Sequence, residues 1–463
     1  MPTQFSVPFA PASLADWHAQ VQKDLKDSHV YESLRWASPE GFTVEPYYTD
    51  TGIEPQQLAF LQAAQKSTPG WLNVPEYTVL PGSEKQLNAT LRNALATGAD
   101  ALLLTIPRAD SPSQSVGTQH PAGVSLPHLL DGIKLSDTPV FFRLGTGVDE
   151  PLFLHALQQV APYQLRGGML SASSTAHPAA GGSPITSLFD TIGRSNESPN
   201  FRVISISSHD FHTAGATATQ ELAFTLARLT ETYSQLLQSG LTVDQLIPKT
   251  LLSVSVGTSY FIEMAKLRAL RVLVARSYPA TTSQAVLVHG QTSTFYEATA
   301  TPYTNLLRAT TEAMAAVLGG ADALTVRPYD AVLAVPHPGT SSEFSERIAR
   351  NVSTLLKAES YLDKVTDPAA GSYYIENLTH QLVEAAWTLY QQVQAMGGFT
   401  KAREAGYVQQ ALDRAYDAKV TAIRMGRVLV GVTKFRHDEA PPPPALTPID
   451  TDEPTRRLSA EFE

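Results

Sequence analysis

From about residue 86 onward, the sequence alternates between long segments with helical periodicity and short apolar runs rich in β-branched residues. The apolar runs are Ala101–Ile106, Pro139–Leu144, Phe201–Ser207, Leu251–Val256, Ala285–Val288 and Ala323–Val326. The candidate helices, with apolar residues at three- and four-residue spacing, are Thr217–Gln238, Tyr260–Arg276, Tyr303–Leu318, Ser342–Ala358 and Leu378–Met396. This alternation predicts a parallel sheet covered by helices, because continuously apolar strands need cover on both faces.

Two architectures fit this pattern, a closed barrel and an open doubly wound sheet. The number of strand and helix units favours the (β/α)8 barrel, which takes about 250 residues and more with insertions. We therefore expect an α/β protein in which residues 61–436 form one decorated (β/α)8 TIM barrel. Two segments rich in small and polar residues, Ala109–Ser125 and Ser171–Pro184, are expected to be surface loops.

The two ends of the chain lack this alternation. Residues 1–60 combine a short amphipathic stretch with the aromatic-rich segment Tyr31–Tyr48, in which Pro39 and Pro46 are expected to prevent a regular element. Because so many apolar side chains need cover, this N-terminal segment is predicted to be an arm that binds a partner. Residues 437–463 contain Pro441–Pro444 and are acidic, which predicts a linker or strap and not a domain.

The composition excludes several kinds of function. The net charge of -10 comes without a run of Lys or Arg that could follow a phosphate backbone, so no nucleic-acid partner is expected. The chain has no cysteine, which excludes disulfides, thiolate metal sites and a cysteine nucleophile. No apolar run approaches the roughly 18 residues of a membrane span, and the N-terminus does not resemble a signal peptide, so a cytoplasmic protein is expected.

Common catalytic motifs are absent from the sequence. We find no phosphate-binding loop, G-x-G-x-x-G, H-E-x-x-H or G-x-S-x-G. The one close histidine pair, His209 and His212, follows the apolar run that ends at Ser207. Active sites of barrels form just past the carboxyl ends of strands, so this pair could bind a metal or act as acid and base. It could equally form hydrogen bonds within its loop, and no metal site is predicted because no third ligand lies nearby.

A series of segments, in order along most of the chain, resembles the methylmalonyl-CoA mutase family. These segments are Trp36–Thr49, Pro69–Trp71, Phe201–Ser208, Ala214–Thr217, Glu263–Arg271, Pro302–Gly320, Ser345–Asn351, Asp367–Glu376, Met396–Ala402 and Val430–Phe435. The resemblance implies an acyl-CoA mutase barrel, in which the pantetheine of CoA runs along the barrel axis and adenosylcobalamin caps the mouth. It also implies the isomerisation of methylmalonyl-CoA to succinyl-CoA in propionate metabolism, with the cofactor supplying the radical chemistry.

The chain departs from the family where catalytic chains carry their reactive groups. Aligned on its flanking segments, Asp210 occupies the position of the family's catalytic histidine, which donates a hydrogen bond to the substrate thioester. An ionised carboxylate cannot donate that bond. Ala300-Thr301 replaces a Gln-Asp pair, and Ala331 replaces a glutamate that faces the cobalamin. Because segments equivalent to R-G-P-Y, T-I-Q-N-D and V-R-N-T-Y are missing too, no catalytic residue is predicted in this chain.

The resemblance does not extend to the family's cobalamin-binding, flavodoxin-like domain. The D-x-H-x-x-G motif of that domain is missing, and Asp16-Trp17-His18 lacks its glycine and lies at the other end of the chain. We therefore predict no cofactor-binding and no metal-binding residues here. Whether the natural chain ends at Glu463 stays open.

Three hypotheses follow from the resemblance and its departures. The favoured one is the small, non-catalytic (beta) subunit of a heterodimeric mutase, inactive alone, with adenosylcobalamin bound by a catalytic large subunit. The alternative is the substrate-binding barrel of a split acyl-CoA mutase whose cobalamin is on a separate chain. A third is a barrel recruited to an unrelated ligand through His209 and His212.

Arg268 and Arg271 share one helical face and could contact a CoA phosphate or form structural ion pairs.

Overall fold

A computed structural model describes residues 13–26, 28–48, 52–106, 123–171, 184–279, 285–334, 341–436 and 456–463. Most of the two expected surface loops, Ala109–Ser125 and Ser171–Pro184, lies outside the described residues, as do residues 1–12 and 437–455. Among the described residues, no helix has both the length and the apolar content needed to cross a membrane.

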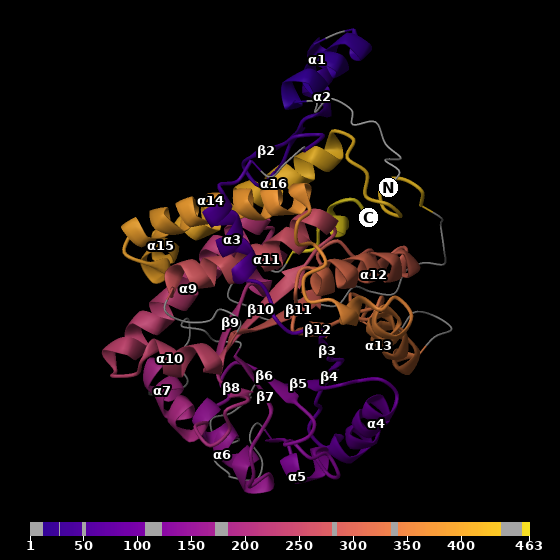
Figure 1. Cartoon of the computed structure of the whole chain (residues 1–463). Helices are drawn as coiled ribbons and strands as arrows, with labels where there is room; N and C mark the ends of the chain where they lie inside the picture. Colours follow the sequence, from indigo (N-terminus) through magenta and orange to yellow (C-terminus); the bar gives the residue numbers. More distant parts are fainter. Residues whose placement is uncertain are drawn as a thin grey trace, which may run out of the picture.

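The strands form a ring of parallel neighbours, which confirms the predicted (β/α)8 barrel (Figure 1). In ring order the strand segments are β3 (Leu72–Asn73) with β4 (Glu76–Thr78), β5 (Leu102–Ile106), β6 (Val140–Leu144), β7 (Gly167–Ser171), β8 (Phe201–Arg202) with β9 (Ile204–Ser207), β10 (Thr250–Val256), β11 (Leu287–Thr292) and β12 (Ala323–Thr325). β3 pairs with β12 and β4 pairs with β5, and only Val74 and Pro75 separate β3 from β4. β8 and β9 join β7 to β10 in the same way across Val203.

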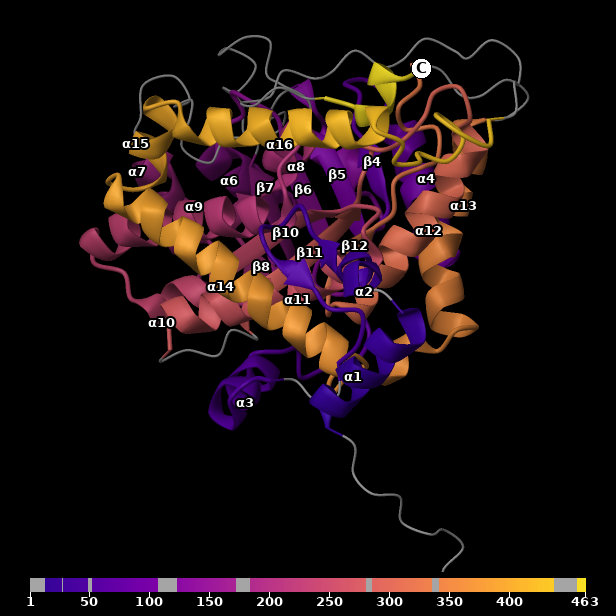
Figure 2. The same cartoon turned by 90° about the horizontal axis from the view of Figure 1, so that it is seen from above.

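Helices surround this ring on its outside or lie at the carboxyl ends of its strands (Figures 1 and 2). They are α4 (Glu84–Ala96), α5 (Leu126–Leu129), α6 (Glu150–Val160), α7 (Pro184–Arg194), α8 (His209–Ala214), α9 (Ala218–Gln238), α10 (Val243–Leu246), α11 (Tyr260–Ser277), α12 (Pro302–Leu318), α13 (Ser342–Ala358), α14 (Tyr373–Ala395), α15 (Phe399–Glu404) and α16 (Tyr407–Arg424). The five predicted helices are confirmed as α9, α11, α12, α13 and α14. The main apolar core lies between the outward faces of the strands and these helices.

The N-terminal arm contains more regular structure than the sequence predicted. It forms α1 (Leu14–Leu25), α2 (Ser28–Leu34), the strands β1 (Trp36–Ala37) and β2 (Thr43–Val44), and α3 (Pro55–Ala63). The expectation that Pro39 and Pro46 prevent regular elements was wrong. β1 and β2 pair antiparallel, with Trp36 opposite Val44, and both prolines fall outside the paired residues. The missing N–H groups therefore cost the hairpin no ladder hydrogen bond.

The arm has two parts that differ in how they attach to the barrel. Residues 38–48 are anchored, because the Glu40 carboxylate accepts a hydrogen bond from the backbone N–H of Thr219 at 2.8 Å and Val44 joins the main core. In contrast, α1 has no buried residue and projects from the molecule together with α2 (Figure 1). The Trp17 ring of α1 contacts the Tyr47 ring, with centroids 4.9 Å apart.

Candidate functional site in the barrel lumen

The lumen of the barrel is apolar at the amino ends of its strands. Residues that alternate with the outward-facing core residues point inward. They form a separate apolar cluster made of Val74, Ala101, Leu103, Phe141, Leu170, Leu251 and Ala323, with Leu72 and Leu287 packed against it. These side chains come from strands on all sides of the ring and fill its axis, as in other barrels of this type.

Toward the carboxyl ends of the strands, the lumen becomes polar and ionic. Glu76 of β4 forms ion pairs with Arg143 of β6 and with Arg327, which follows β12. The second terminal nitrogen of Arg143 donates to the Gln291 side chain of β11 at 2.7 Å. β6 and β11 are the third and seventh strands of the ring and therefore lie opposite each other. This hydrogen bond crosses the lumen.

Burial and these two arginines act on Glu76 in opposite directions. Burial raises the pKa of the Glu76 carboxyl, but the guanidinium groups of Arg143 and Arg327 outweigh it and hold that pKa well below its usual range. Glu76 is therefore ionised at neutral pH. A single carboxylate balances two partly buried cations.

A second set of hydrogen bonds runs around the wall of the lumen. His209 of α8 pairs through Nδ1 with Ser255 Oγ at 2.6 Å and through Nε2 with Ser253 Oγ at 2.7 Å. Ser253 Oγ also pairs with Nδ1 of His289 at 2.8 Å, and His289 Nε2 pairs with Thr325 Oγ1 at 2.9 Å. Glu76, Arg143, Arg327, Gln291, His209, Ser253 and His289 are together called the lumen network.

Both imidazoles of the lumen network are held neutral. Burial, followed by the positive charge of Arg143, lowers the pKa of His289 to about 3 and places that of His209 well below its usual value. Neutral rings flanked by hydroxyls use one nitrogen as donor and the other as acceptor, so each ring is satisfied. Neither ring has a nitrogen left for a ligand.

His212 belongs to a different buried cluster, which connects α8 with α9, α11 and the loop after β11. Its Nδ1 pairs with Glu221 Oε1 and its Nε2 with Ser293 Oγ, both at 2.7 Å. Glu221 also binds the Lys266 ammonium at 3.1 Å, and Lys266 binds Glu263 at 2.6 Å. The structure therefore separates His209 from His212 and engages all four of their ring nitrogens. In the part of the chain that the structure describes, no group of three or more His, Cys, Asp or Glu could hold a metal ion.

Asp210, the residue aligned with the family's catalytic histidine, pairs with Arg228 of α9. The Arg228 guanidinium donates to both carboxylate oxygens, at 3.1 and 2.6 Å. The same guanidinium lies over the Phe211 and Phe399 rings, 4.0 and 4.7 Å from their centroids. Successive helical residues point about 100° apart, so His209 reaches the lumen while Asp210 reaches α9.

The other positions that depart from the family also lie past the carboxyl ends of strands. Ala300 is buried after β11, and the Thr301 hydroxyl donates to the Gly431 carbonyl at 3.0 Å. Ala331 follows β12 in a turn closed by its N–H donating to the Pro328 carbonyl at 2.9 Å. A methyl side chain can neither ligate nor hydrogen-bond a cofactor.

Arg268 and Arg271 of α11 form structural ion pairs. Arg268 binds Asp367 and also Glu376 of α14 at 2.9 Å, while Arg271 binds Asp322 at 2.7 Å. Both arginine side chains are almost completely buried. The structural alternative is confirmed, because these guanidinium groups are committed to carboxylates between elements and are not open to a CoA phosphate.

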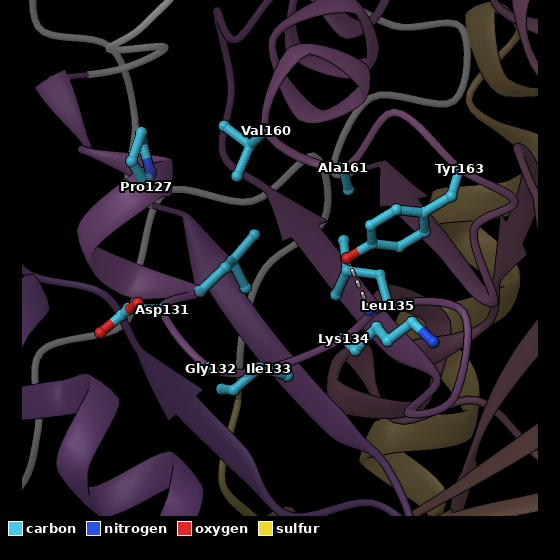
Figure 3. Close-up of a pocket in the computed structure, with 10 residues that line it drawn as sticks. Pro127, Asp131, Gly132, Ile133, Lys134, Leu135, Val160, Ala161 and Tyr163 are labelled. Atoms are coloured by element: carbon cyan, nitrogen blue, oxygen red, sulfur yellow. Dashed lines mark hydrogen bonds between the residues drawn. The ribbon is translucent and has the colours of Figure 1, made fainter.

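A surface pocket of about 400 Å³ lies at the opposite end of the barrel (Figure 3). Its walls are the loop from Leu130 to Leu135, which leads into β6, and the end of α6 with Val160, Ala161 and Tyr163. The Leu135 N–H donates to the Tyr163 hydroxyl at 3.3 Å. The walls combine apolar side chains with those of Asp131, Lys134 and Tyr163.

The fold and the polar lumen define an α/β protein of the (β/α)8 barrel class. The family model described as methylmalonyl-CoA mutase matches residues 183–462. A methylmalonyl-CoA mutase of Rhizobium meliloti is 34% identical, covering 93% of this chain and 65% of that protein. A probable methylmalonyl-CoA mutase small subunit of Mycobacterium tuberculosis is 32% identical, covering 94% and 71%, and a small subunit of Porphyromonas gingivalis is 29% identical, covering 92% and 70%. The chain belongs to the methylmalonyl-CoA mutase family.

The residues at the mouth do not fit the cobalamin that this family implies. A histidine can ligate cobalt only through a free ring nitrogen, whereas His209, His212 and His289 are enclosed and hydrogen-bonded at both nitrogens. Ala331 offers no polar group at the rim. We assign no step to a cofactor bound by this chain.

Sequence reasoning missed most of the lumen network. Glu76, Arg143 and Gln291 come from three strands and Arg327 follows a fourth, and only barrel closure brings them together. One signal was available, because Arg143 interrupts the apolar run Val140–Leu144 at an inward-facing position. A charged residue at such a position needs an ionic partner inside the barrel.

Proposed function

We propose that this chain is the small, non-catalytic subunit of a heterodimeric, adenosylcobalamin-dependent methylmalonyl-CoA mutase. A catalytic large subunit binds the cofactor and carries out the isomerisation of methylmalonyl-CoA to succinyl-CoA. The role of this chain is to bind the large subunit and keep it in its active conformation. The relatives that match most of this chain include proteins named small subunits, which supports this assignment.

The observation that carries the proposal is the closed lumen. A pantetheine running along the axis would meet the apolar cluster around Phe141 and Leu251 first. It would then meet the Arg143–Gln291 hydrogen bond and the Glu76 ion pairs, which cross the same space. Opening that path would leave buried charges without partners, which costs several kcal/mol.

The chemistry at the mouth supports the same conclusion. The Asp210 carboxylate only accepts hydrogen bonds, and the Arg228 guanidinium already occupies both of its oxygens. It therefore cannot stabilise negative charge on a thioester oxygen. A split acyl-CoA mutase would need both an open axis and a hydrogen-bond donor here, so the non-catalytic role is the better supported of the two.

The test compares the purified chain with its Asp210→His and Asp210→Asn variants, each alone and mixed with a catalytic large subunit. We expect no turnover of methylmalonyl-CoA by any of the three alone, and no cobalamin absorption carried through gel filtration. Asp210→Asn is the matched control, because it keeps the shape of the side chain and part of its pairing to Arg228. Both variants should stay inactive alone, since catalytic groups that act as a unit are not restored singly. Turnover or stoichiometric cobalamin in any of these isolated chains would instead support the split-enzyme alternative.

A further inference from the structure

Residues 456–463, called the clasp, lie beside the mouth of the barrel and contain a 3-10 helix, Leu458–Glu461. The Arg456 N–H donates to the Thr213 carbonyl at the end of α8 at 2.9 Å, and the Leu458 N–H donates to the Phe295 carbonyl after β11 at 2.8 Å. The Tyr416 hydroxyl of α16 donates to the Glu461 carboxylate at 2.8 Å. Figures 1 and 2 both show this end of the chain beside α16. The clasp thus joins two loops of the mouth and one outer helix.

The loop after β11 presents a row of polar groups that match the clasp. The Glu297 carbonyl accepts from the Arg457 guanidinium at 2.9 Å and from the Ser459 hydroxyl. The Glu463 carboxylate accepts from the backbone N–H of Thr299 at 2.6 Å and from its hydroxyl at 2.8 Å. These include backbone groups of the loop itself, so the loop is built to receive a segment with this order of donors and acceptors, here folded as a 3-10 turn over Leu458–Glu461.

One apolar side chain anchors the clasp. Leu458 is 2% exposed and packs in a small cluster with Phe295, Tyr416, Val420 and Val432, separate from the main core. The Arg456 side chain, by contrast, lies over the Tyr416 ring and pairs with Asp413 at a site that is partly open to solvent. A half-exposed ion pair adds little free energy. Leu458 and the hydrogen bonds to the loop therefore determine most of the affinity.

We propose that the groove between Thr213, residues 295–299 and α16 is a peptide-binding site, and that the clasp is its displaceable occupant. Its ligand is a short segment, extended at the arginine and continuing as a single 3-10 turn, in which an arginine, a leucine and a serine precede acidic residues. All of the hydrogen bonds and ion pairs described above for the clasp end on α8, on the loop after β11 or on α16, and none ends on a barrel strand. The interface is that of a docked peptide and not of a core element.

The tether explains how so small a contact keeps the clasp in place. Residues 437–455 link the clasp to the barrel in sequence. A linker of this length gives an effective concentration on the order of 1 mM, so a peptide dissociation constant of about 0.1 mM suffices for roughly 90% occupancy. Release of the clasp removes its hydrogen bonds to α8 and to the loop after β11. The fraction of molecules with the clasp bound therefore determines how rigid these two segments of the mouth are.

The experiment uses the full chain with a site-specific protease sequence inserted between Pro444 and Ala445, which leaves every described residue in place. After cleavage and dilution, a fluorescent peptide with the sequence of residues 456–463 is titrated against cut and uncut protein. We expect saturable binding to the cut protein and binding about tenfold weaker to the uncut protein, in which the tethered clasp competes. Hydrogen exchange should rise after dilution at residues 209–216 and 293–301 and stay unchanged in the strands.

Variant peptides test which groups determine the affinity. Leu458→Asp should weaken binding at least about a hundredfold, because it places a charge in an apolar site. Ser459→Ala should weaken binding roughly tenfold through one lost hydrogen bond. Ala460→Ser is the matched control, because Ala460 is exposed and its variant should bind like the parent peptide.

Three results would overturn the inference. The first is loss of folded structure when the cut clasp dissociates, measured by circular dichroism, which would make the segment part of the core. The second is binding that is equal for cut and uncut protein, or equal for the parent and Leu458→Asp peptides, which would place the peptide elsewhere. The third is a cut protein that stays folded but rebinds no peptide.

Discussion

In the lumen network, each polar side chain is matched by another from the same chain, whereas the N-terminal arm leaves several large apolar side chains only partly covered. Glu76 lies between two arginines, and His209 and His289 are paired at both nitrogens. The arm leaves Leu14, Leu34, Trp36 and Tyr47 between 41% and 49% exposed. A catalytic lumen keeps groups free for a transition state, and an interface keeps apolar side chains free for a partner. This chain pairs the polar side chains of its lumen network with one another and leaves apolar side chains of its arm exposed.

The largest effect is expected from breaking the lumen network at its centre. Glu76→Ala leaves Arg143 and Arg327 facing each other inside the barrel without a counter-charge. Removing one partner of a buried ion pair costs about 3–5 kcal/mol. We expect a loss of about 3 kcal/mol or more in the free energy of unfolding, measured by urea denaturation of the isolated chain.

The control for this variant is an ion pair on the surface. Arg276 and Glu384 pair at 2.7 Å, and their side chains are 33% and 50% exposed. Glu384→Ala should cost no more than about 1 kcal/mol, because solvent already screens the pair. If the two variants lost equal stability, the lumen network would not be the tightly coupled centre that we describe.

The second effect is a loss of stability in acid that originates in the lumen. Burial and the Arg143 charge lower the pKa of His289 to about 3 in the folded chain, against 6.5 for the unfolded group. Between pH 6.5 and pH 3, the unfolded state therefore binds a proton at His289 that the folded state does not bind. Stability from this group is complete above pH 6.5 and is lost as the pH falls toward 3.

His289→Gln removes this proton uptake and keeps hydrogen-bonding groups beside Ser253 and Thr325. At pH 5.5 the histidine term amounts to about 1.4 kcal/mol. The parent chain should lose that much more stability than His289→Gln between pH 7.5 and pH 5.5, measured by denaturation at both values. Parallel losses in the two proteins would mean that His289 is protonated in the folded chain.

Much of the barrel could be predicted from the sequence, and the failures have physical causes. The helix Ser342–Ala358 was predicted with its observed ends, because its apolar period is regular and Ser341 caps it through the Phe344 N–H. β7 was missed because it begins Gly167-Gly168 and lacks a β-branched run. A Cβ at Gly167 would lie 2.1 Å from the Val140 carbonyl oxygen, so close strand packing demands glycine there. That contact depends on the neighbouring strand and leaves no local signal.

The site was predictable in part for a similar reason. The sequence identified His209, Asp210 and His212 as residues past a strand end, where barrels place reactive groups. It could not say that they point in three directions, toward Ser253 and Ser255, toward Arg228, and toward Glu221 and Ser293. A short helix separates adjacent side chains in angle, and only the folded chain shows what each one meets.

The smallest effect on the isolated chain is expected from the arm, where the comparison with the lumen can be made sharpest. Trp17→Ala removes the ring that packs on Tyr47, but α1 contributes no buried residue to the barrel. The free energy of unfolding should change by less than about 0.5 kcal/mol, with Trp71 and Trp387 still reporting on the barrel by fluorescence. Pairing with a catalytic large subunit should nevertheless weaken about thirtyfold or more, because aromatic anchors dominate interface energies at about 2 kcal/mol each. Gln22→Ala replaces an exposed polar side chain on the same helix. It is the matched control and should leave both the free energy of unfolding and the pairing affinity unchanged.

A truncation should end at residue 35 and not at residue 50, since Glu40 and Val44 belong to the part of the arm that is anchored to the barrel. If Trp17→Ala and this truncation both left the pairing affinity intact, α1 and α2 would bind no partner, and the interface would have to lie elsewhere on the barrel.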